Sequence, residues 1–162
     1  MNDAHLHMVV NHFPIIGTIL AIGILTAGIL SKNQSIINTS YVLFIIGAVF
    51  GILSMNTGEG AEEIVEDMPS IGWKIIHEHE ELAEKMALLL NILGVLSLIG
   101  FYFQYKRNPK QKLISYLILI IGIASLFVIR KVGTSGGEIR HTEIRNSTSS
   151  TLSDKENTDH ED

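Results

Sequence analysis

Residues 13–30 read FPIIGTILAIGILTAGIL and contain no charged side chain. The hydrocarbon core of a bilayer is about 30 Å thick, and a helix that rises about 1.5 Å per residue crosses it with roughly 17–25 residues. A stretch of this length and apolar composition therefore predicts a helix that spans a membrane. In lipid the segment must be helical, because an unpaired backbone amide there costs several kcal/mol.

Three more runs without charged residues lie at 41–55, 86–103 and 113–129. With their flanking residues they predict spans at about 36–55, 82–103 and 113–130. A soluble four-helix bundle is the alternative interpretation, but its helices would carry polar faces, and these stretches have none. The sequence thus predicts an all-α, integral membrane four-helix bundle in residues 1–145, with the lipid bilayer as its first partner.

Small residues indicate how these helices pack. Gly47 and Gly51 form a GxxxG pattern, which allows two helix backbones to approach closely in lipid. We expect this pattern to serve contacts inside the bundle rather than dimerisation. The oligomeric state itself stays open.

Composition excludes several classes of function. The chain has 162 residues, a formal net charge of −5 and no cysteine, which excludes disulfides, thiolate catalysis and cysteine-held iron–sulfur clusters. An acidic balance without a basic, aromatic-rich patch argues against nucleic acid as a partner. The segment 146–162 is polar, low in complexity and free of aromatic residues, which predicts a disordered acidic tail.

Loop charges indicate the orientation in the membrane. Four of the eight residues in the loop 105–112 are Lys or Arg, and such a dense basic loop favours the cytoplasm. The density of this loop, rather than the total number of basic residues at each end, places both termini on the outer side.

The histidines gather at one membrane face. An even number of spans brings the N-terminal segment, the loop 56–82 and the segment 131–145 to the same side of the membrane. Six of the seven histidines lie there, namely His5, His7, His12, His77, His79 and His141. Helical spacing points His79 into the bundle. His12 lies at the mouth of the first span, where an ionisable group is costly unless it is paired.

Acidic residues accompany these histidines. Glu59, Glu62, Glu63 and Glu66 recur at positions i, i+3, i+4 and i+7. This spacing aligns four carboxylates on one side of a helix. The sequence therefore predicts a short acidic helix on the membrane surface, between the second and third spans.

Glycine predicts the place of His141. Three glycines between residues 133 and 137 follow the fourth span, and we expect them to break its helix and turn the chain across the end of the bundle. His141 would then approach His12 and His79. Imidazole is the commonest protein ligand of transition metals, and carboxylates complete or orient such sites.

Three motifs carry a family resemblance. They are His7-Met-Val-Val-Asn-His12-Phe-Pro-Ile, then Thr57-Gly-Glu59-Gly-Ala61-Glu62-Glu63 with His79-Glu80-Glu81-Leu-Ala83, and finally Gly136-Gly137-Glu138-Ile-Arg140-His141. Over about residues 5–145 the chain resembles the bacterial four-helix membrane family known as domain of unknown function 2231. The resemblance implies a place in the bacterial inner (plasma) membrane but no established activity. Some members resemble fusions to Rieske-type iron–sulfur domains, which suggests a redox protein as partner.

Two classes of function follow from these features. In the first, the protein serves electron transfer and binds haem b through His12 and His79, or a copper, zinc or iron ion through a larger set. That set is His7, His12, His79, His141, Glu59, Glu62 and Glu63. In the second, the protein is a non-catalytic membrane subunit whose histidines and acids contact a partner protein. A transporter is disfavoured because no span carries a charge at mid-membrane, and whether the protein is an enzyme stays open.

Overall fold

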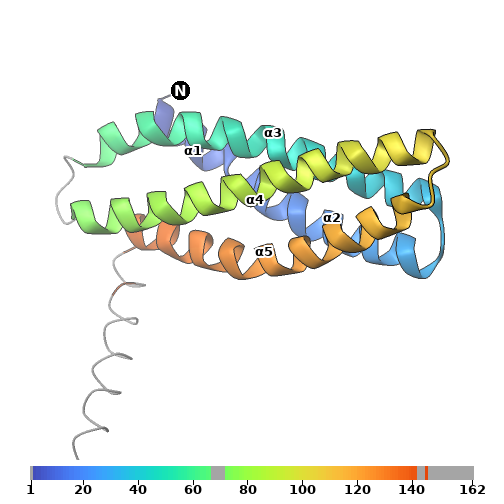
Figure 1. Cartoon of the computed structure of the whole chain (residues 1–162). Helices are drawn as coiled ribbons and strands as arrows, with labels where there is room; N and C mark the ends of the chain where they lie inside the picture. Colours follow the sequence, from blue (N-terminus) through green and yellow to red (C-terminus); the bar gives the residue numbers. More distant parts are fainter. Residues whose placement is uncertain (1, 67–71, 142–144, 146–162) are drawn as a thin grey trace, which may run out of the picture.

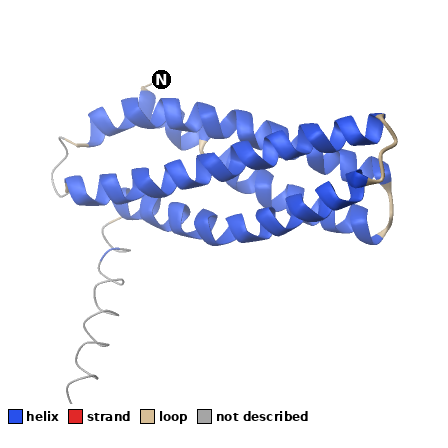
Figure 2. Ribbon diagram, in the orientation of Figure 1, coloured by secondary structure: helices blue, strands red, loops and turns tan. Residues whose placement is uncertain are grey.

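The computed structural model describes residues 2–66, 72–141 and 145, and the regular structure within them is entirely helical. Figures 1 and 2 show long helices that run side by side, with a short helix near the N-terminus. The helices are α1 Asp3–Val10, α2 His12–Leu30, α3 Gln34–Val65, α4 Trp73–Tyr105 and α5 Lys110–Arg140. The predicted tail 146–162 lies outside the described residues.

Four helical segments are long and apolar enough to cross a membrane, namely α1 with α2, then α3, α4 and α5. The spans predicted from hydropathy lie within α2, α3, α4 and α5. The prediction of an all-helical chain with four apolar helices, compatible with a multi-pass membrane protein, is confirmed.

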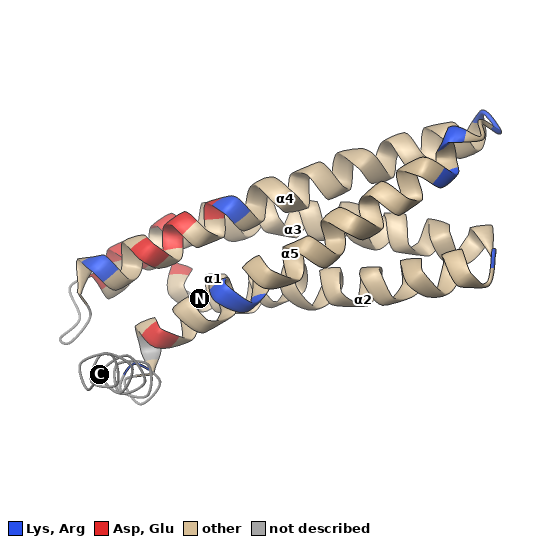
Figure 3. Ribbon diagram, turned by 60° about the horizontal axis from the view of Figure 1, so that its bottom comes forward, with Lys and Arg blue, Asp and Glu red and all other residues tan. Residues whose placement is uncertain are grey.

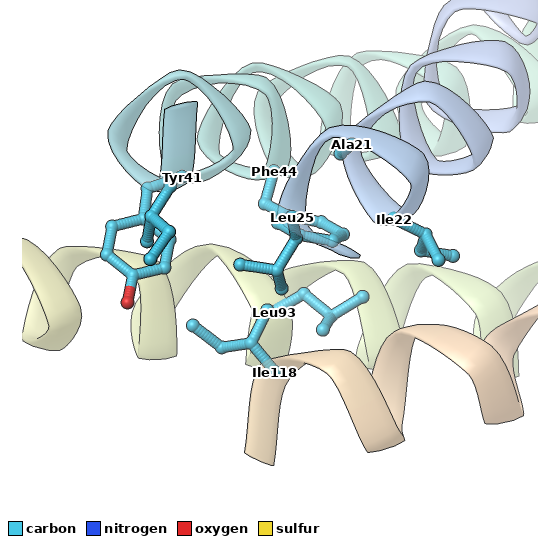
Figure 4. Close-up of a cluster of buried hydrophobic side chains, with 8 residues drawn as sticks. Ala21, Ile22, Leu25, Tyr41, Phe44, Leu93 and Ile118 are labelled. Carbon is cyan, nitrogen blue, oxygen red and sulfur yellow. The ribbon is translucent and has the colours of Figure 1, made fainter. Parts of the chain in front are cut away.

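The largest cluster of buried side chains draws on all four long helices (Figure 4). It includes Ala21 and Leu25 of α2, Phe44 of α3, Leu93 of α4 and Ile118 of α5. Each of these side chains is at most 1% exposed. This cluster holds the long helices together in the part of the bundle that contains the predicted spans.

The GxxxG pattern packs inside the bundle, as predicted. Gly47 and Gly51 of α3 both face Leu90 of α4, and a Cβ atom built on Gly51 would lie 2.8 Å from Cδ1 of Leu90. A side chain at this position would therefore require the side chain of Leu90 to move.

The outer surface of the long helices is apolar. Leu30 is 78% exposed, Phe127 75% and Leu113 67%. Extended apolar surface of this kind is unfavourable in water and is typical of proteins that face a membrane.

One end of the bundle is acidic. Figure 1 places the N-terminus, the last turns of α3, the first turns of α4 and the end of α5 at the same end. Figure 3 shows the Asp and Glu residues gathered there, whereas the charged residues described at the opposite end are Lys and Arg. We define the acidic end as residues 3–12, 54–66, 73–85 and 131–141.

The acidic residues 59–66 do not form the separate surface helix that the sequence predicts. They belong to the last turns of α3, which continues without interruption to Val65, and to its C-cap residue Glu66. Gly58 and Gly60 stay helical because α1 packs on them, and a Cβ on Gly60 would lie 2.9 Å from Cβ of Asp3.

The long helices exceed the thickness of a bilayer core. α3, α4 and α5 contain 32, 33 and 31 residues. At about 1.5 Å per residue they are about 46–50 Å long, against a core of about 30 Å. Most of the acidic end extends beyond the predicted spans.

Candidate functional site

His7 lies on α1 against the last turns of α3. Its Nδ1 is 3.0 Å from the carbonyl oxygen of Ser54 and 3.2 Å from Oγ1 of Thr57. Gly58 leaves space for the ring, since a Cβ there would lie 3.4 Å from Cε1 of His7. A carbonyl oxygen can only accept, so Nδ1 of His7 donates. In the neutral ring Nε2 therefore carries the lone pair.

His79 takes the corresponding position on α4. Its Nδ1 is 2.9 Å from Oγ of Ser135 on α5, and Ser135 donates its own hydroxyl hydrogen to the carbonyl oxygen of Val132 at 3.1 Å. With this hydrogen directed to Val132, Ser135 accepts from Nδ1 of His79. In this tautomer neutral His79 also carries its lone pair on Nε2.

A glycine leaves space for the His79 ring too. A Cβ built on Gly136 of α5 would lie 3.0 Å from Cε1 of His79. The predicted inward direction of His79 is confirmed, because the ring contacts α5. Met86 and Leu90, which share its face of α4, are buried.

Burial changes the acid–base properties of both rings, which lie outside the predicted spans. It lowers the pKa of His7 below the ordinary value of 6.5, although the hydrogen bond to Ser54 opposes this shift. It also lowers the pKa of His79, and the charge of a protonated His7 lowers it further. The two imidazoles therefore lie close enough to influence one another, and both are mainly neutral at pH 7.

His12, which the sequence pairs with His79, takes a different place. It is the first residue of α2, its side chain is exposed, and its Nδ1 donates to the carbonyl oxygen of Met8 on α1. The electrostatic partner of His79 in the structure is His7. Sequence spacing could not show this, because it depends on how α1 packs against α3.

The predicted carboxylate ligands lie on the last turns of α3. Glu62 is half-buried, whereas Glu59 and Glu63 are exposed. Glu62 follows Gly58 by four residues, which is about one helical turn. Of the three carboxylates, Glu62 is therefore on the part of the helix surface nearest to His7.

The predicted turn of the chain before His141 is wrong. α5 continues through the glycines at 133, 136 and 137 to Arg140, and His141 is its exposed C-cap residue. Gly136 stays in the helix and receives the His79 ring instead of breaking the chain. His141 lies five residues beyond Gly136, about 7 Å farther along the helix axis.

No three His, Asp or Glu side chains among the described residues form a group that could hold a metal ion. The larger predicted ligand set is thus not assembled within this part of the chain. Between His7 on α1 and His79 on α4 the interaction is electrostatic, since the charge of a protonated His7 lowers the pKa of His79.

The remaining histidines of the described bundle lie on the surface. His5 is exposed on α1. His77 stacks on Trp73, with ring centroids 4.8 Å apart, and lies 3.5 Å from a carboxylate oxygen of Glu80 and 3.6 Å from one of Glu81. His5 and His77 therefore offer matched controls for His7 and His79, each two residues away on the same helix.

The residues that orient the pair were not predicted, although the sequence contains a signal for them. His7 faces Thr57 and Gly58, and His79 faces Ser135 and Gly136. Each imidazole thus meets a hydroxyl residue followed directly by glycine. The glycine gives the ring space and the hydroxyl residue gives Nδ1 a hydrogen-bond partner.

Comparisons with protein-family models, with curated proteins and with solved structures found no match to this chain.

Proposed function

We propose that the protein is a membrane electron-transfer protein that binds haem b, or a copper, zinc or iron ion, at His7 and His79. One observation carries this proposal. Two imidazoles from different helices each have Nδ1 engaged as a donor, which leaves Nε2 as the nitrogen with the lone pair. Hydrogen bonds of this kind orient histidine ligands and fix their tautomer in metal sites.

The similarity of the two histidine environments supports the same proposal. α1 and α3 place His7 beside Thr57-Gly58, while α4 and α5 place His79 beside Ser135-Gly136. In each case the hydroxyl residue is a hydrogen-bond partner of Nδ1. His7 and His79 would hold the iron of a haem, or would contribute two ligands to a metal ion.

The donor set fits either group. Neutral imidazole is a ligand for iron, copper and zinc, and both rings are mainly neutral at pH 7. Bound iron or copper would supply one-electron transfer, which zinc does not. The residues of this chain would orient the two Nε2 atoms and shield them from water. Further ligands from the predicted set remain candidates, namely His12, His141, Glu59, Glu62 and Glu63.

Absorption spectra and elemental analysis of the detergent-purified protein test the proposal. A Soret band that shifts with dithionite identifies haem, and a stoichiometric metal content without that band identifies an ion. We expect His7→Ala and His79→Ala to lose the bound group, and His5→Ala and His77→Ala to retain it. The proposal fails if the purified protein contains neither group, or if both His7→Ala and His79→Ala retain it.

A second candidate function is a non-catalytic subunit whose acidic end contacts a partner, such as a redox protein. The observation in its favour is Trp73, which is 71% exposed at the acidic end and stacks on His77. Aromatic residues are enriched in protein interfaces. In this case Trp73→Ala would abolish co-purification of the partner, and His79→Ala would leave any bound cofactor unchanged.

We further propose that the acidic end and both termini lie on the outer side of the bacterial inner (plasma) membrane. The dense basic loop between α4 and α5 supports this orientation. The cysteine-free chain allows a direct test with single cysteines at the two ends, Lys74→Cys and Ser31→Cys. A membrane-impermeant maleimide should label the first in intact cells and the second only after lysis, and the opposite result would reverse the orientation.

A further inference from the structure

An open groove of about 430 Å³ lies between α4 and α5 at the acidic end. Its apolar part is formed by Leu82 of α4 and Phe127 of α5, and the Phe127 side chain is 75% exposed. Phe127 belongs to the predicted span 113–130. The groove therefore lies where the bilayer core gives way to the headgroup region.

The chemistry of the groove wall changes along the bundle axis. Arg130 and Lys131 follow Phe127 by about one helical turn on the same face of α5, and Glu138 follows them by about two turns. On α4, Glu78 also lies on the outer side of the groove. The order from the predicted span outwards is apolar, then cationic, then anionic.

We propose that this groove binds one aminophospholipid of the phosphatidylethanolamine type from the adjacent leaflet. Arg130 and Lys131 bind its phosphate, the carboxylate of Glu78 accepts hydrogen bonds from its ammonium group, and an acyl chain covers Phe127. The order of charges in the headgroup, with phosphate nearer the bilayer core and ammonium farther out, matches the order of the groove wall. The inference depends on the membrane location and does not require haem or metal, although Ser135, the partner of His79, also lines the groove.

The two cations are available for a phosphate. Within residues 2–66, 72–141 and 145, neither Arg130 nor Lys131 forms an ion pair, whereas Lys74 and Lys85 each pair with a glutamate of α4. Arg and Lys at this depth extend their charged ends towards the headgroup region while the aliphatic part of the side chain stays in apolar surroundings. A phosphate is the anion that the headgroup region supplies.

The acidic side of the groove selects the type of lipid. An anionic headgroup without an ammonium group would bring negative charge towards Glu78, where like charges repel. The present partner of Glu78 is Lys74 at 3.7 Å, and both side chains are well exposed, so this pair is weak. A primary ammonium group can replace it, and its N–H donors distinguish it from the quaternary ammonium of phosphatidylcholine.

Native mass spectrometry of the full chain in detergent tests this proposal with three synthetic lipids of identical acyl chains. These are phosphatidylethanolamine, phosphatidylcholine and phosphatidylglycerol, added at equal concentration. We expect one retained phosphatidylethanolamine per chain, with roughly tenfold weaker retention of the other two, because each lacks a charge-assisted hydrogen bond to the groove.

Variants assign the effect to the groove. Arg130→Gln with Lys131→Gln should weaken retention of phosphatidylethanolamine about tenfold, and Glu78→Gln should remove its preference over phosphatidylglycerol. The matched controls are Lys85→Gln and Glu84→Gln, which change exposed charges of α4 outside the groove. Circular dichroism checks the fold, and Arg130→Gln alone replaces the double variant if that one loses helix.

Equal retention of the three lipids would overturn the proposal. So would stronger retention of phosphatidylglycerol, which indicates attraction of anionic lipid alone. Unchanged retention in both the Arg130→Gln, Lys131→Gln double variant and Glu78→Gln would place the lipid elsewhere.

Discussion

The apolar middle of the bundle, which contains the predicted spans, and the acidic end both rely on glycine, but the glycines face different neighbours. In the apolar middle, Gly51 faces Leu90, and Gly100 faces the ring of Tyr41. These neighbours fill space, and the close approach of the helices adds dispersion contacts in lipid.

At the acidic end the neighbour is a histidine. Gly58 faces His7 and Gly136 faces His79, and each ring also donates a hydrogen bond from Nδ1 to a residue of the opposing helix. A buried imidazole needs a hydrogen-bond partner as well as space, and in a metal site such a partner also fixes the tautomer. The following predictions test whether these two rings are ligands.

The largest effect on stability is expected at Gly100. A Cβ there would lie 2.6 Å from Cε2 of Tyr41, and a buried aromatic ring cannot yield without moving the helices. Gly100→Ala should therefore lower the free energy of unfolding by about 1–3 kcal/mol, measured by denaturant titration in detergent. Cofactor content per folded molecule should not change.

Gly17→Ala is the matched control, because a Cβ there meets nothing within 4 Å. This substitution should leave the free energy of unfolding unchanged or raise it by up to about 1 kcal/mol, since alanine favours the helix. Equal stability of the two variants would mean that the contact between Gly100 and Tyr41 is not tight.

At the acidic end, Ser135→Ala should reduce affinity for the bound metal or haem by about 10- to 100-fold. The substitution removes the acceptor that holds Nδ1 of His79 and leaves the bundle packed. Thr134→Ala is the control, because that hydroxyl is exposed and donates only to the carbonyl oxygen of Arg130 on its own helix. Titration of the apo-protein measures both, and equal affinities would remove Ser135 from the site.

A smaller loss of affinity is expected for Gly136→Ala. The added Cβ would lie 3.0 Å from Cε1 of His79, so the ring must shift by a few tenths of an ångström. Displacement of this kind costs about 0.5–1.5 kcal/mol, which is roughly two- to tenfold in affinity. Gly133→Ala, where a Cβ meets nothing within 4 Å, should bind as the wild type does. A stability loss without an affinity loss in Gly136→Ala would make this glycine a packing residue.

Much of the fold could be predicted because the hydropathy of a helix depends only on residues that are close together in the sequence. The charge-free run at 13–30 and the inward direction of His79 follow from helix length and helical spacing alone. The continuation of α3 past residue 55 could not be predicted this way. Gly58 and Gly60 read as helix-weakening residues in isolation, and only the contact with α1 explains them.

The site was predicted in part for the same reason. The gathering of histidines at one end follows from the number of spans. The pairing of His12 with His79 stays a prediction. The place of His7 against Ser54 depends on a tertiary contact between α1 and α3, which sequence spacing does not show. Glycine at 136 was interpreted as a helix breaker, although it leaves the space that the His79 ring occupies.

The smallest expected effect is a dependence of stability on pH in the metal-free protein. The pKa values of His7 and His79 are lowered from 6.5 in the folded state by burial, so the unfolded chain binds more protons just below pH 6.5. The contribution of these two histidines to the free energy of unfolding should therefore be constant above pH 6.5. It should fall as the pH decreases below 6.5. His7→Gln with His79→Gln should reduce that fall, measured by thermal unfolding with chelator between pH 7.5 and 5. His5→Gln with His77→Gln should retain it, because those rings are exposed. If the free energy of unfolding changed with pH by the same slope in both double variants, the buried pair would not resist protonation. The two rings at the acidic end would then not differ from exposed histidines in this property.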